Sequence, residues 1–182
     1  MSDAIEFIGA ASAVADPMND TWGVCFPYKS AYQFWPSMTG YGGAIFDSNG
    51  NPTINSVATV TAIQTIGTIL AGHPDGAYGP LMKVGCDWGN MEDMFKANKV
   101  AFMIQGPWAY GGINDANVNF GFSTLPDSPV AIPFSPFVGM KGWSVSSGSA
   151  NKEAAVTVAK YFAGYDSQVE FAKTAKLLPT MP

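Results

Sequence analysis

The sequence predicts an α/β protein, because helical patterns alternate with short apolar strands along its 182 residues. A helical pattern with Met91, Met94 and Phe95 on one side runs directly into the continuous apolar stretch 100–104, which is typical of a buried strand. A second helical pattern starts after Ser56. With 47% hydrophobic residues, the chain is long enough for one large domain or for parts of two.

The N-terminal quarter is expected to contain a helix, a strand and an aromatic segment. Ser2 can cap the helix and Asp16-Pro17 ends it, with an apolar face formed by Ile5, Ile8, Ala11 and Ala15. A strand is predicted around 24–26. The following segment, 27–43, is too rich in rings and glycine for an ordinary linker, so we expect it to line a cleft. Its rings are Tyr28, Tyr32, Phe34, Trp35 and Tyr41.

A turn and a helix are predicted next. Residues 44–54 predict two short strands around an Asn49-Gly50 turn. Asp47, Asn49 and Asn51 also match the start of a calcium-binding loop, but the later acidic ligand is missing, so the hairpin is preferred. Ser56 is expected to cap a helix that Gly72 ends, and its apolar face is formed by Val57, Val60, Ile63, Ile66 and Leu70.

The second half continues the alternation. Asp87 is interpreted as a turn residue before the helix that precedes strand 100–104. Residues 118–122 alternate as in a strand, and 125–136 carry four prolines without periodicity, which indicates an extended linker.

The C-terminal part predicts a strand at 142–147 and two helices. Ser149 or Asn151 caps the first helix, which Gly164 ends; its inward residues are Ala155, Val158, Ala159 and Phe162. The second helix runs from Asp166 to about 175, and 177–182 are extended.

Charge and composition exclude several function classes. The net charge is −5, and the basic residues are nine lysines with no arginine, which disfavours nucleic-acid binding and bidentate recognition of phosphate or carboxylate. No apolar stretch is long enough to span a bilayer. No basic and apolar leader opens the chain, so we expect any export signal to lie upstream or to have been replaced.

The cysteines and the single histidine are assigned structural roles. Cys25 and Cys86 lack a CxxC spacing and a neighbouring histidine, so a metal site is disfavoured and no cofactor is expected. Each is expected to be a buried free thiol, and a disulfide between them is an alternative that the sequence leaves open. His73 lies in a turn-forming stretch and is interpreted as a solvated loop residue.

An aromatic platform is predicted where strand 100–104 leads into Gly106, Pro107 and Trp108. Pro107 suits the first position of a following helix, and Gly106 is expected to let another molecule approach the backbone closely. An indole beside free backbone donors, away from any charge, suits the apolar face of a sugar ring. Carbohydrate capture is therefore the leading functional hypothesis.

Several segments, taken in order, resemble one family of binding proteins. They are 50–56 (GNPTINS), 87–89 (DWG) with 94–96 (MFK), 100–108 (VAFMIQGPW), 118–121 (VNFG) with 125–126 (LP), 142–146 (GWSVS), 151–155 (NKEAA) and 177–179 (LLP). Each is weak alone, but their order and spacing together are specific. The chain thereby resembles the family-one extracellular solute-binding proteins of ABC sugar importers, the maltose-binding-protein type.

The resemblance implies a periplasmic-binding-protein-like (type II) architecture of two α/β lobes, present here only in part, because family members are about twice as long. It assigns 1–127 to most of the second (C-terminal) lobe, 128–141 to a hinge crossing, and 142–182 to a strand and helices that return to the first lobe. It further implies a non-enzymatic monomer, periplasmic or membrane-anchored outside the cell. Such a protein captures a neutral sugar or oligosaccharide and presents it to membrane permease subunits.

The resemblance also carries over ligand contacts where the motifs align. The main stacking residue is Trp108, and the other contacts are Tyr32, Trp35, Trp88, Tyr110 and Trp143. A pyranose has C–H groups on one face and hydroxyls at its rim, so aromatic plates with a few polar partners bind it without full charges. Gln33 or Asn90 could supply such partners, and Ser30 stands where some maltose binders carry an acidic residue.

Three alternative interpretations stay open. Core packing is the alternative for every aromatic residue, and Trp22 in particular is interpreted as a structural cover. A carbohydrate-active enzyme would need two carboxylates about 5–10 Å apart, whereas the adjacent Glu92 and Asp93 are better interpreted as helix-start residues. An interaction module would turn its aromatic residues toward another protein. The sequence carries no hydrolase or metalloenzyme motif.

Overall fold

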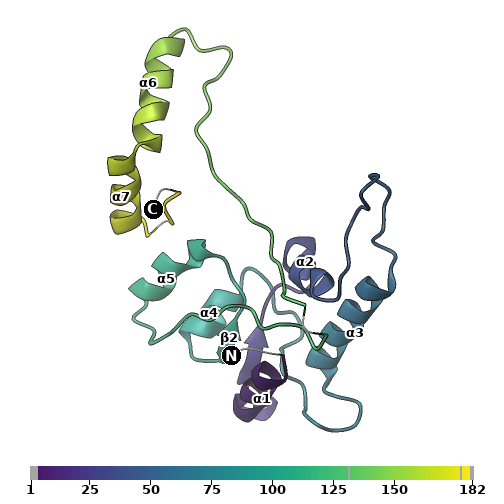
Figure 1. The fold of residues 1–182 in the computed structure, drawn as a ribbon. Coiled ribbons are helices and arrows are strands. Elements are labelled where there is room, and N and C mark those ends of the chain that lie inside the picture. Colours follow the sequence, from purple (N-terminus) through teal and green to yellow (C-terminus); the bar gives the residue numbers. More distant parts are fainter. Residues whose placement is uncertain (1–3, 131, 177, 181–182) are drawn as a thin grey trace. The chain divides into compact units, whose positions relative to one another are not determined.

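Two parallel strands form the centre of the first part of the chain in the computed structural model, which describes residues 4–130, 132–176 and 178–180. Strand β1 (Trp22–Cys25) pairs with β2 (Val100–Met103), so that Trp22 lies opposite Val100 and Cys25 opposite Met103. Helix α1 (Ala4–Val14) packs against both strands, and the short helix α4 (Met91–Lys96) packs against β2 (Figure 1). The predicted α/β organisation is present.

The described residues group into two compact units. The first contains the residues up to Gln105 together with Asn119–Phe137, and the second contains Gly106–Val118 together with the residues from Val138 onward. The first unit also holds the 3₁₀ helix η1 (Pro17–Asn19), α2 (Ala31–Thr39) and α3 (Val57–Ala71). The second unit holds η2 (Pro107–Ala109), α5 (Tyr110–Asp115), α6 (Lys152–Ala163) and α7 (Tyr165–Thr174). The assignment of 1–127, 128–141 and 142–182 to lobes and a hinge stays a prediction.

The core of the first unit surrounds β1. Its buried members are Ala11, Val24, Cys25, Phe26, Ile66, Leu81, Met82, Cys86, Met91 and Val100. The predicted first helix is confirmed as α1, but Ile5 of its predicted inner face is 77% exposed. The buried side carries the small residues Ala4 and Ala11, which let the helix approach the strands closely, and Phe7, whose ring centroid lies 5.2 Å from that of Phe102. The predicted cap at Ser2 lies outside the described residues, as do positions 177 and 181–182 of the predicted extended end.

Helix α3 starts as predicted but buries a different face. The Ser56 Oγ accepts a hydrogen bond of 3.3 Å from the Thr59 backbone N–H, which confirms the N-cap. Of the predicted apolar face only Ile66 is buried, whereas the buried side also includes Thr59 and Ala62; the predicted residues Val57, Val60 and Ile63 are exposed. Partial burial of the α3 threonines is tolerated because their hydroxyls are hydrogen-bonded, as in the 2.8 Å bond between Tyr41 Oη and Thr65 Oγ1.

Helix α2 forms inside the segment that was expected only to line a cleft. It contains Pro36, a residue that removes one backbone donor from the helix and therefore argues against a helix from sequence. Gln33, Pro36 and Met38 are buried, so packing stabilises this helix despite its unfavourable proline.

Four predicted strands, two of them in the hairpin at 44–54, are absent from the described residues. The hairpin at 44–54 is reduced to a single bridge between Phe46 and Pro52, closed by Asp47, which accepts hydrogen bonds from the Asn49 and Asn51 backbone N–H groups. Residues 118–122 form no strand, and Phe120 instead makes edge contacts with Phe95 and Phe122. Residues 142–147 also form no strand, because no neighbouring strand among the described residues pairs with them.

The two C-terminal helices of the second unit occur close to their predicted positions. Helix α6 follows Asn151, and α7 follows directly after Gly164. Phe162 joins them, since its ring centroid lies 6.1 Å from that of Phe171. No residue of α6 is buried, although Ala155, Ala159 and Phe162 of its predicted inner face are half-buried; Val158 is 52% exposed.

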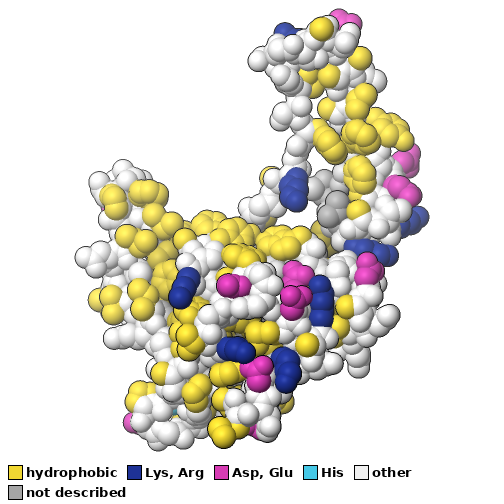
Figure 2. Space-filling view, turned by 180° about the vertical axis from the view of Figure 1, so that it is seen from behind, with side chains coloured by type: hydrophobic (Ala, Val, Ile, Leu, Met, Phe, Trp, Pro, Cys, Tyr) yellow, Lys and Arg dark blue, Asp and Glu magenta, His cyan; other side chains and the backbone are white. Residues whose placement is uncertain are grey.

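Many large hydrophobic side chains are exposed among the described residues. Hydrophobic side chains cover much of the face seen in Figure 2, and charged side chains are scattered between them. Large exposed examples are Ile5, Met18, Val57, Val84, Phe122, Val138 and Met140. Among the described residues, no helix combines the length and apolar character needed to cross a bilayer.

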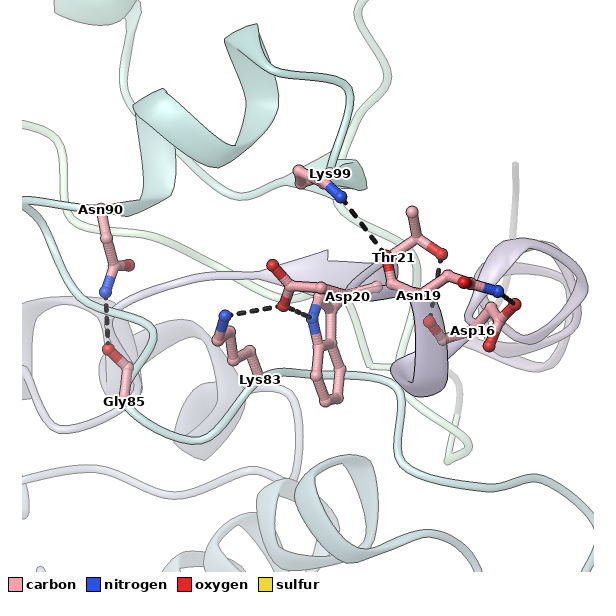
Figure 3. Close-up of polar contacts among 9 residues, drawn as sticks. Asp16, Asn19, Asp20, Thr21, Lys83, Gly85, Asn90 and Lys99 are labelled. Carbon is pink, nitrogen blue, oxygen red and sulfur yellow. Dashed lines mark hydrogen bonds and ion pairs between the residues drawn. The ribbon is translucent and has the colours of Figure 1, made fainter.

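An exposed network of polar side chains joins the start of β1 to the segment before α4. Asp20 accepts a hydrogen bond of 2.6 Å from Lys83 Nζ and one of 3.0 Å from the Trp22 indole N–H. Both bonds lower the pKa of the Asp20 carboxyl, and the bond from Lys83 has the larger effect (Figure 3). Trp22 also packs half-buried against the core, in agreement with its predicted structural role.

Replacing Gly23 with alanine should strongly destabilise the first unit. A Cβ at Gly23 would lie 2.5 Å from the Ala11 carbonyl oxygen and 2.7 Å from its Cβ, so α1 would have to move off β1. We expect Gly23→Ala to lower the free energy of unfolding by about 2–4 kcal/mol in urea titrations. Gly9 is exposed on α1 with no atom near the added Cβ, so Gly9→Ala should raise stability by about 0.5–1 kcal/mol. Equal effects of the two substitutions would contradict this packing.

The Asp20 network should make stability depend on pH in a defined direction. Because the pKa of Asp20 is lower in the folded chain than in the unfolded chain, its contribution is present near neutral pH and is lost as the pH falls below about 4. We expect Asp20→Asn to reduce the difference in urea midpoint between pH 7 and pH 3. Lys83→Gln removes the hydrogen bond that lowers the pKa of Asp20 most and should act in the same direction. An unchanged difference in both variants would show that the network is unimportant in solution.

Candidate functional site

An open pocket of about 310 Å³ lies in the first unit, where the chain leaves β1. One wall is formed by Pro27, Lys29 and Ser30, and the other by residues 85–88. The first wall belongs to the segment that was expected to line a cleft, and the second contains the predicted contact Trp88, which is 42% exposed. The pocket therefore brings together two regions that the sequence analysis proposed separately.

The first wall is a tight turn between β1 and α2. The Ser30 backbone N–H donates to the Pro27 carbonyl at 2.8 Å, and Ser30 occupies the N-cap position of α2 without a side-chain capping bond. The Lys29 Nζ lies 5.7 Å from the centroid of the Tyr28 ring. This wall therefore contributes two polar residues, Lys29 and Ser30, to the lining of the pocket.

The second wall is joined to β1 by a disulfide between Cys25 and Cys86, whose Cα atoms are 5.9 Å apart. The expectation of two free thiols is therefore wrong. The two residues meet because the preceding segment runs along β1: the backbone N–H groups of Gly23 and Val24 both donate to the Leu81 carbonyl. Such a tertiary contact carries no signal in the local sequence around either cysteine.

Local hydrogen bonds shape the second wall, and the one from Asn90 to Gly85 is drawn in Figure 3. The Asp87 Oδ1 accepts bonds of 2.8 Å and 3.0 Å from the Gly89 and Asn90 backbone N–H groups, which confirms Asp87 as a turn residue. The Asn90 side chain donates to the Gly85 carbonyl and accepts from the Asp87 backbone N–H. Asn90 thus uses its amide to build this turn, so its suggested role as a hydroxyl partner has no support in the structure. Gln33, the other suggested partner, is buried at 6% exposure.

Tyr32 and Trp35 share a third ring that sequence reasoning missed. Phe137 stacks on Trp35 at a centroid distance of 4.4 Å and tilts against Tyr32 at 5.5 Å. Hydrogen bonds between Thr39 and the backbone of Ser135 hold this segment on α2. The only signal for this contact in the sequence was that Phe137 is an aromatic residue, flanked by two apolar residues, in a segment without periodicity.

The second unit carries Trp108 and Tyr110 at the start of its first helices. Pro107 occupies the first turn of η2 as predicted, and Trp108 is 51% exposed while Tyr110 is half-buried. The indole of Trp108 folds back over Gly106, where an added Cβ would collide with the ring. The Trp108 indole therefore fills the space beside Gly106. The expectation that another molecule approaches the backbone there is wrong.

Trp143 completes the predicted set. Its indole stacks on Phe162 with 4.8 Å between centroids and an interplanar angle of 29°, while 58% of the residue stays exposed. Each unit therefore holds three of the six predicted contacts: Tyr32, Trp35 and Trp88 in the first, and Trp108, Tyr110 and Trp143 in the second.

The acidic residues Glu92 and Asp93 lie in the first turn of α4, as predicted. Glu92 makes an ion pair of 3.4 Å with Lys96 and accepts a hydrogen bond of 3.3 Å from Gln105. Among the described residues, no group of three or more histidine, cysteine, aspartate and glutamate side chains is arranged to hold a metal ion.

The fold of Trp108 over Gly106 can be tested by substitution. Gly106 has φ −88° and ψ 169°, which alanine also adopts, so Gly106→Ala acts only through its clash with the indole. We expect Trp108 to become more accessible, measured as stronger acrylamide quenching of tryptophan fluorescence. The increase should vanish in a Trp108→Phe background, and Gly121→Ala, with open space at its Cβ, should leave quenching unchanged. Quenching that does not respond to Gly106→Ala would contradict this ring position.

Comparison with known proteins places the whole described chain in one family. The family described as bacterial extracellular solute-binding protein matches residues 3–182. A galactooligosaccharide-binding protein of Bacillus subtilis is 30% identical over 146 residues, which cover 77% of this chain and 34% of that protein. The maltodextrin-binding protein MdxE of Bacillus subtilis is 26% identical over 175 residues, covering 92% of this chain and 40% of the relative.

Solved structures show the same relationship. The maltose/maltodextrin-binding domain from Bdellovibrio bacteriovorus, bound to maltotriose, superimposes with a TM-score of 0.83 at 28% identity and covers 98% of this chain and 48% of its own. The maltotriose-binding protein of Thermus thermophilus gives a TM-score of 0.76 at 28% identity, covering 94% of this chain and 46% of its own. The chain spans about half the length of these structures and less of the curated relatives. It belongs to the bacterial extracellular solute-binding proteins and carries part of their type II periplasmic-binding fold.

Proposed function

We propose that this protein is the substrate-binding component of an ABC importer, which captures a neutral oligosaccharide by aromatic stacking and delivers it to permease subunits. The observation that carries the proposal is the half-exposed indole of Trp108, held over a Gly-Pro turn at the start of η2. A ring fixed in this way loses little conformational freedom when a sugar stacks on it. Trp88 and Trp143 add further exposed indoles.

The chemistry of the pocket supports an uncharged ligand. Lys29, Ser30 and Asp87 line it together with Trp88, and polar residues beside a ring are the mixture that binds a sugar rim and a sugar face. The chain has no arginine for bidentate recognition of an anionic ligand. The names of the relatives, which refer to galactooligosaccharide and maltodextrin, favour a ligand of several sugar units.

Two arguments support a location outside the cytoplasm. The family is described as extracellular. Cys25 and Cys86 form a disulfide, and disulfides persist in oxidising compartments outside the cytoplasm. Relatives in Streptococcus pneumoniae are named solute-binding lipoproteins, so we propose that the natural protein is anchored to the membrane by lipid and acts as a monomer.

A glycoside hydrolase is disfavoured by the same residues. Glu92, in the first turn of α4, is paired with Lys96, and the relatives are named as binding proteins. A screen of mixed oligosaccharides that released no new reducing ends would agree with a receptor, whereas catalytic hydrolysis would contradict it.

Removing the Trp108 ring should weaken sugar binding. We expect Trp108→Ala, in the protein at its natural length, to reduce affinity for maltotriose by about 1–3 kcal/mol, which is the typical contribution of one stacking platform. Trp108→Phe should retain part of the affinity because a smaller ring remains. Isothermal titration calorimetry measures both values.

Tyr161→Ala is the matched control, because Tyr161 is an exposed aromatic residue of α6 outside the proposed contacts. It should leave the affinity unchanged. Unchanged affinity in Trp108→Ala would remove Trp108 from the site. A wild-type protein that bound neither maltotriose nor a galactooligosaccharide would contradict the proposed function.

A further inference from the structure

We infer that Lys29 and Asp87 determine the specificity of the pocket, as a donor and an acceptor of opposite charge that bind sugar hydroxyls from its two walls and disfavour ionic ligands. The inference rests on the proposed function, since it concerns the same ligand and the same pocket. It adds to that function a mechanism by which uncharged saccharides are selected.

The two residues are the charged members of the pocket lining, one on each wall. Lys29 belongs to the wall that follows β1, and Asp87 belongs to the wall formed by 85–88. Both walls lie in the first unit, and the other lining residues carry no charge. The formal charges of the lining therefore cancel, so the pocket offers no net electrostatic attraction to an ionic ligand.

Asp87 holds its carboxylate in place with one oxygen and leaves the other available. The Oδ1 atom accepts the backbone N–H bonds of Gly89 and Asn90, which orients the side chain. Within the part of the chain that the structure describes, Oδ2 accepts no hydrogen bond. A carboxylate has lone pairs for several donors, so Oδ2 can accept a bond from a ligand hydroxyl without breaking the turn.

The Lys29 ammonium is also not committed to an acidic partner. It lies near the Tyr28 ring, and among the described residues it makes no ion pair and donates no hydrogen bond. Lys83 and Lys96, in contrast, are paired with carboxylates. An ammonium group carries three donors and no acceptor, so Lys29 complements the acceptor on the opposite wall.

A hydroxyl group matches both residues, because it donates one hydrogen bond and accepts others. Hydrogen bonds with one charged partner are stronger than bonds between neutral groups, so the two residues can bind a neutral sugar tightly. A carboxylate on the ligand would be attracted by Lys29 and repelled by Asp87, and the two effects offset each other. The pair therefore favours a ligand that has hydroxyls and no charge.

Removing one charge at a time in the natural-length protein tests this mechanism. Asp87→Asn keeps a side-chain oxygen for the Gly89 and Asn90 bonds, and Lys29→Gln removes no hydrogen bond of the described fold. Calorimetry measures the affinity for maltotriose and for maltotriose oxidised to a carboxylate on both terminal units. We expect each variant to bind maltotriose roughly 3- to 30-fold more weakly.

The two variants should change the preference for maltotriose over the anionic probe in opposite directions. Asp87→Asn leaves Lys29 as the single charge of the lining, so the preference should fall by about 3- to 30-fold. Lys29→Gln leaves Asp87 alone, so the preference should rise by a similar factor. If Asp87 only shapes the turn, Asp87→Asn should instead bind both probes like the wild type, because the acceptor of the turn is retained.

Two residues outside the lining provide matched controls. Asp47 accepts backbone N–H bonds from Asn49 and Asn51 in another turn of the first unit. Lys99 directly precedes β2, at the end of the strand pair opposite to the one that leads into the pocket. Asp47→Asn and Lys99→Gln should leave both affinities unchanged, and circular dichroism confirms that every variant is folded.

The outcomes are distinct. Wild-type affinities for both probes in Asp87→Asn and Lys29→Gln, or a preference that moves in the same direction in both, would overturn the inference and leave the proposed function intact. If Asp87→Asn does not fold, Lys29→Gln decides alone, because Lys29 is exposed. Absence of binding by the wild type to maltotriose and to a galactooligosaccharide would instead refute the proposed function.

Discussion

The parallel pairing of β1 with β2 is the constraint on which the first unit depends. It places Cys25 opposite Met103, so both strands end at the same edge of the sheet. The Leu81 carbonyl binds the other side of β1 and brings the segment before α4 to that edge. The pocket walls and the disulfide follow from this arrangement, because one wall continues from β1 and the other from the segment on Leu81.

Aromatic residues proposed as ligand contacts are held by other rings or by the backbone. Trp35 stacks on Phe137, Trp143 stacks on Phe162, and the Trp108 indole covers Gly106. Such contacts fix a ring in one orientation while leaving Trp108 and Trp143 more than half exposed. A receptor built on stacking benefits from this order, since the entropy of placing the ring is lost on folding and not on binding.

Comparison of the expected and observed elements shows where local signals suffice. The cap at Ser56, the first-turn Pro107 and the helices after Asn151 and Gly164 appear as predicted, because capping and helix propensity act within a few residues. The strands at 118–122 and 142–147 were wrong, since a strand requires a partner that its own sequence does not specify. The predicted buried face of α3 was wrong too, because Thr59 and Ala62 are buried where valine and isoleucine were expected.

The sequence by itself determined the family, the N-cap at Ser56 and the place of Pro107 in the first turn of a helix, all of which depend on residue types at short spacing. Only the tertiary structure decided that Cys25 and Cys86 form a disulfide, that Phe137 joins Tyr32 and Trp35, and that the Trp108 ring occupies the space at Gly106. The first two depend on residues far apart in the chain, and the third depends on a side-chain orientation. Neither distance in space nor orientation is encoded by local pattern, because both are set by how the whole unit packs.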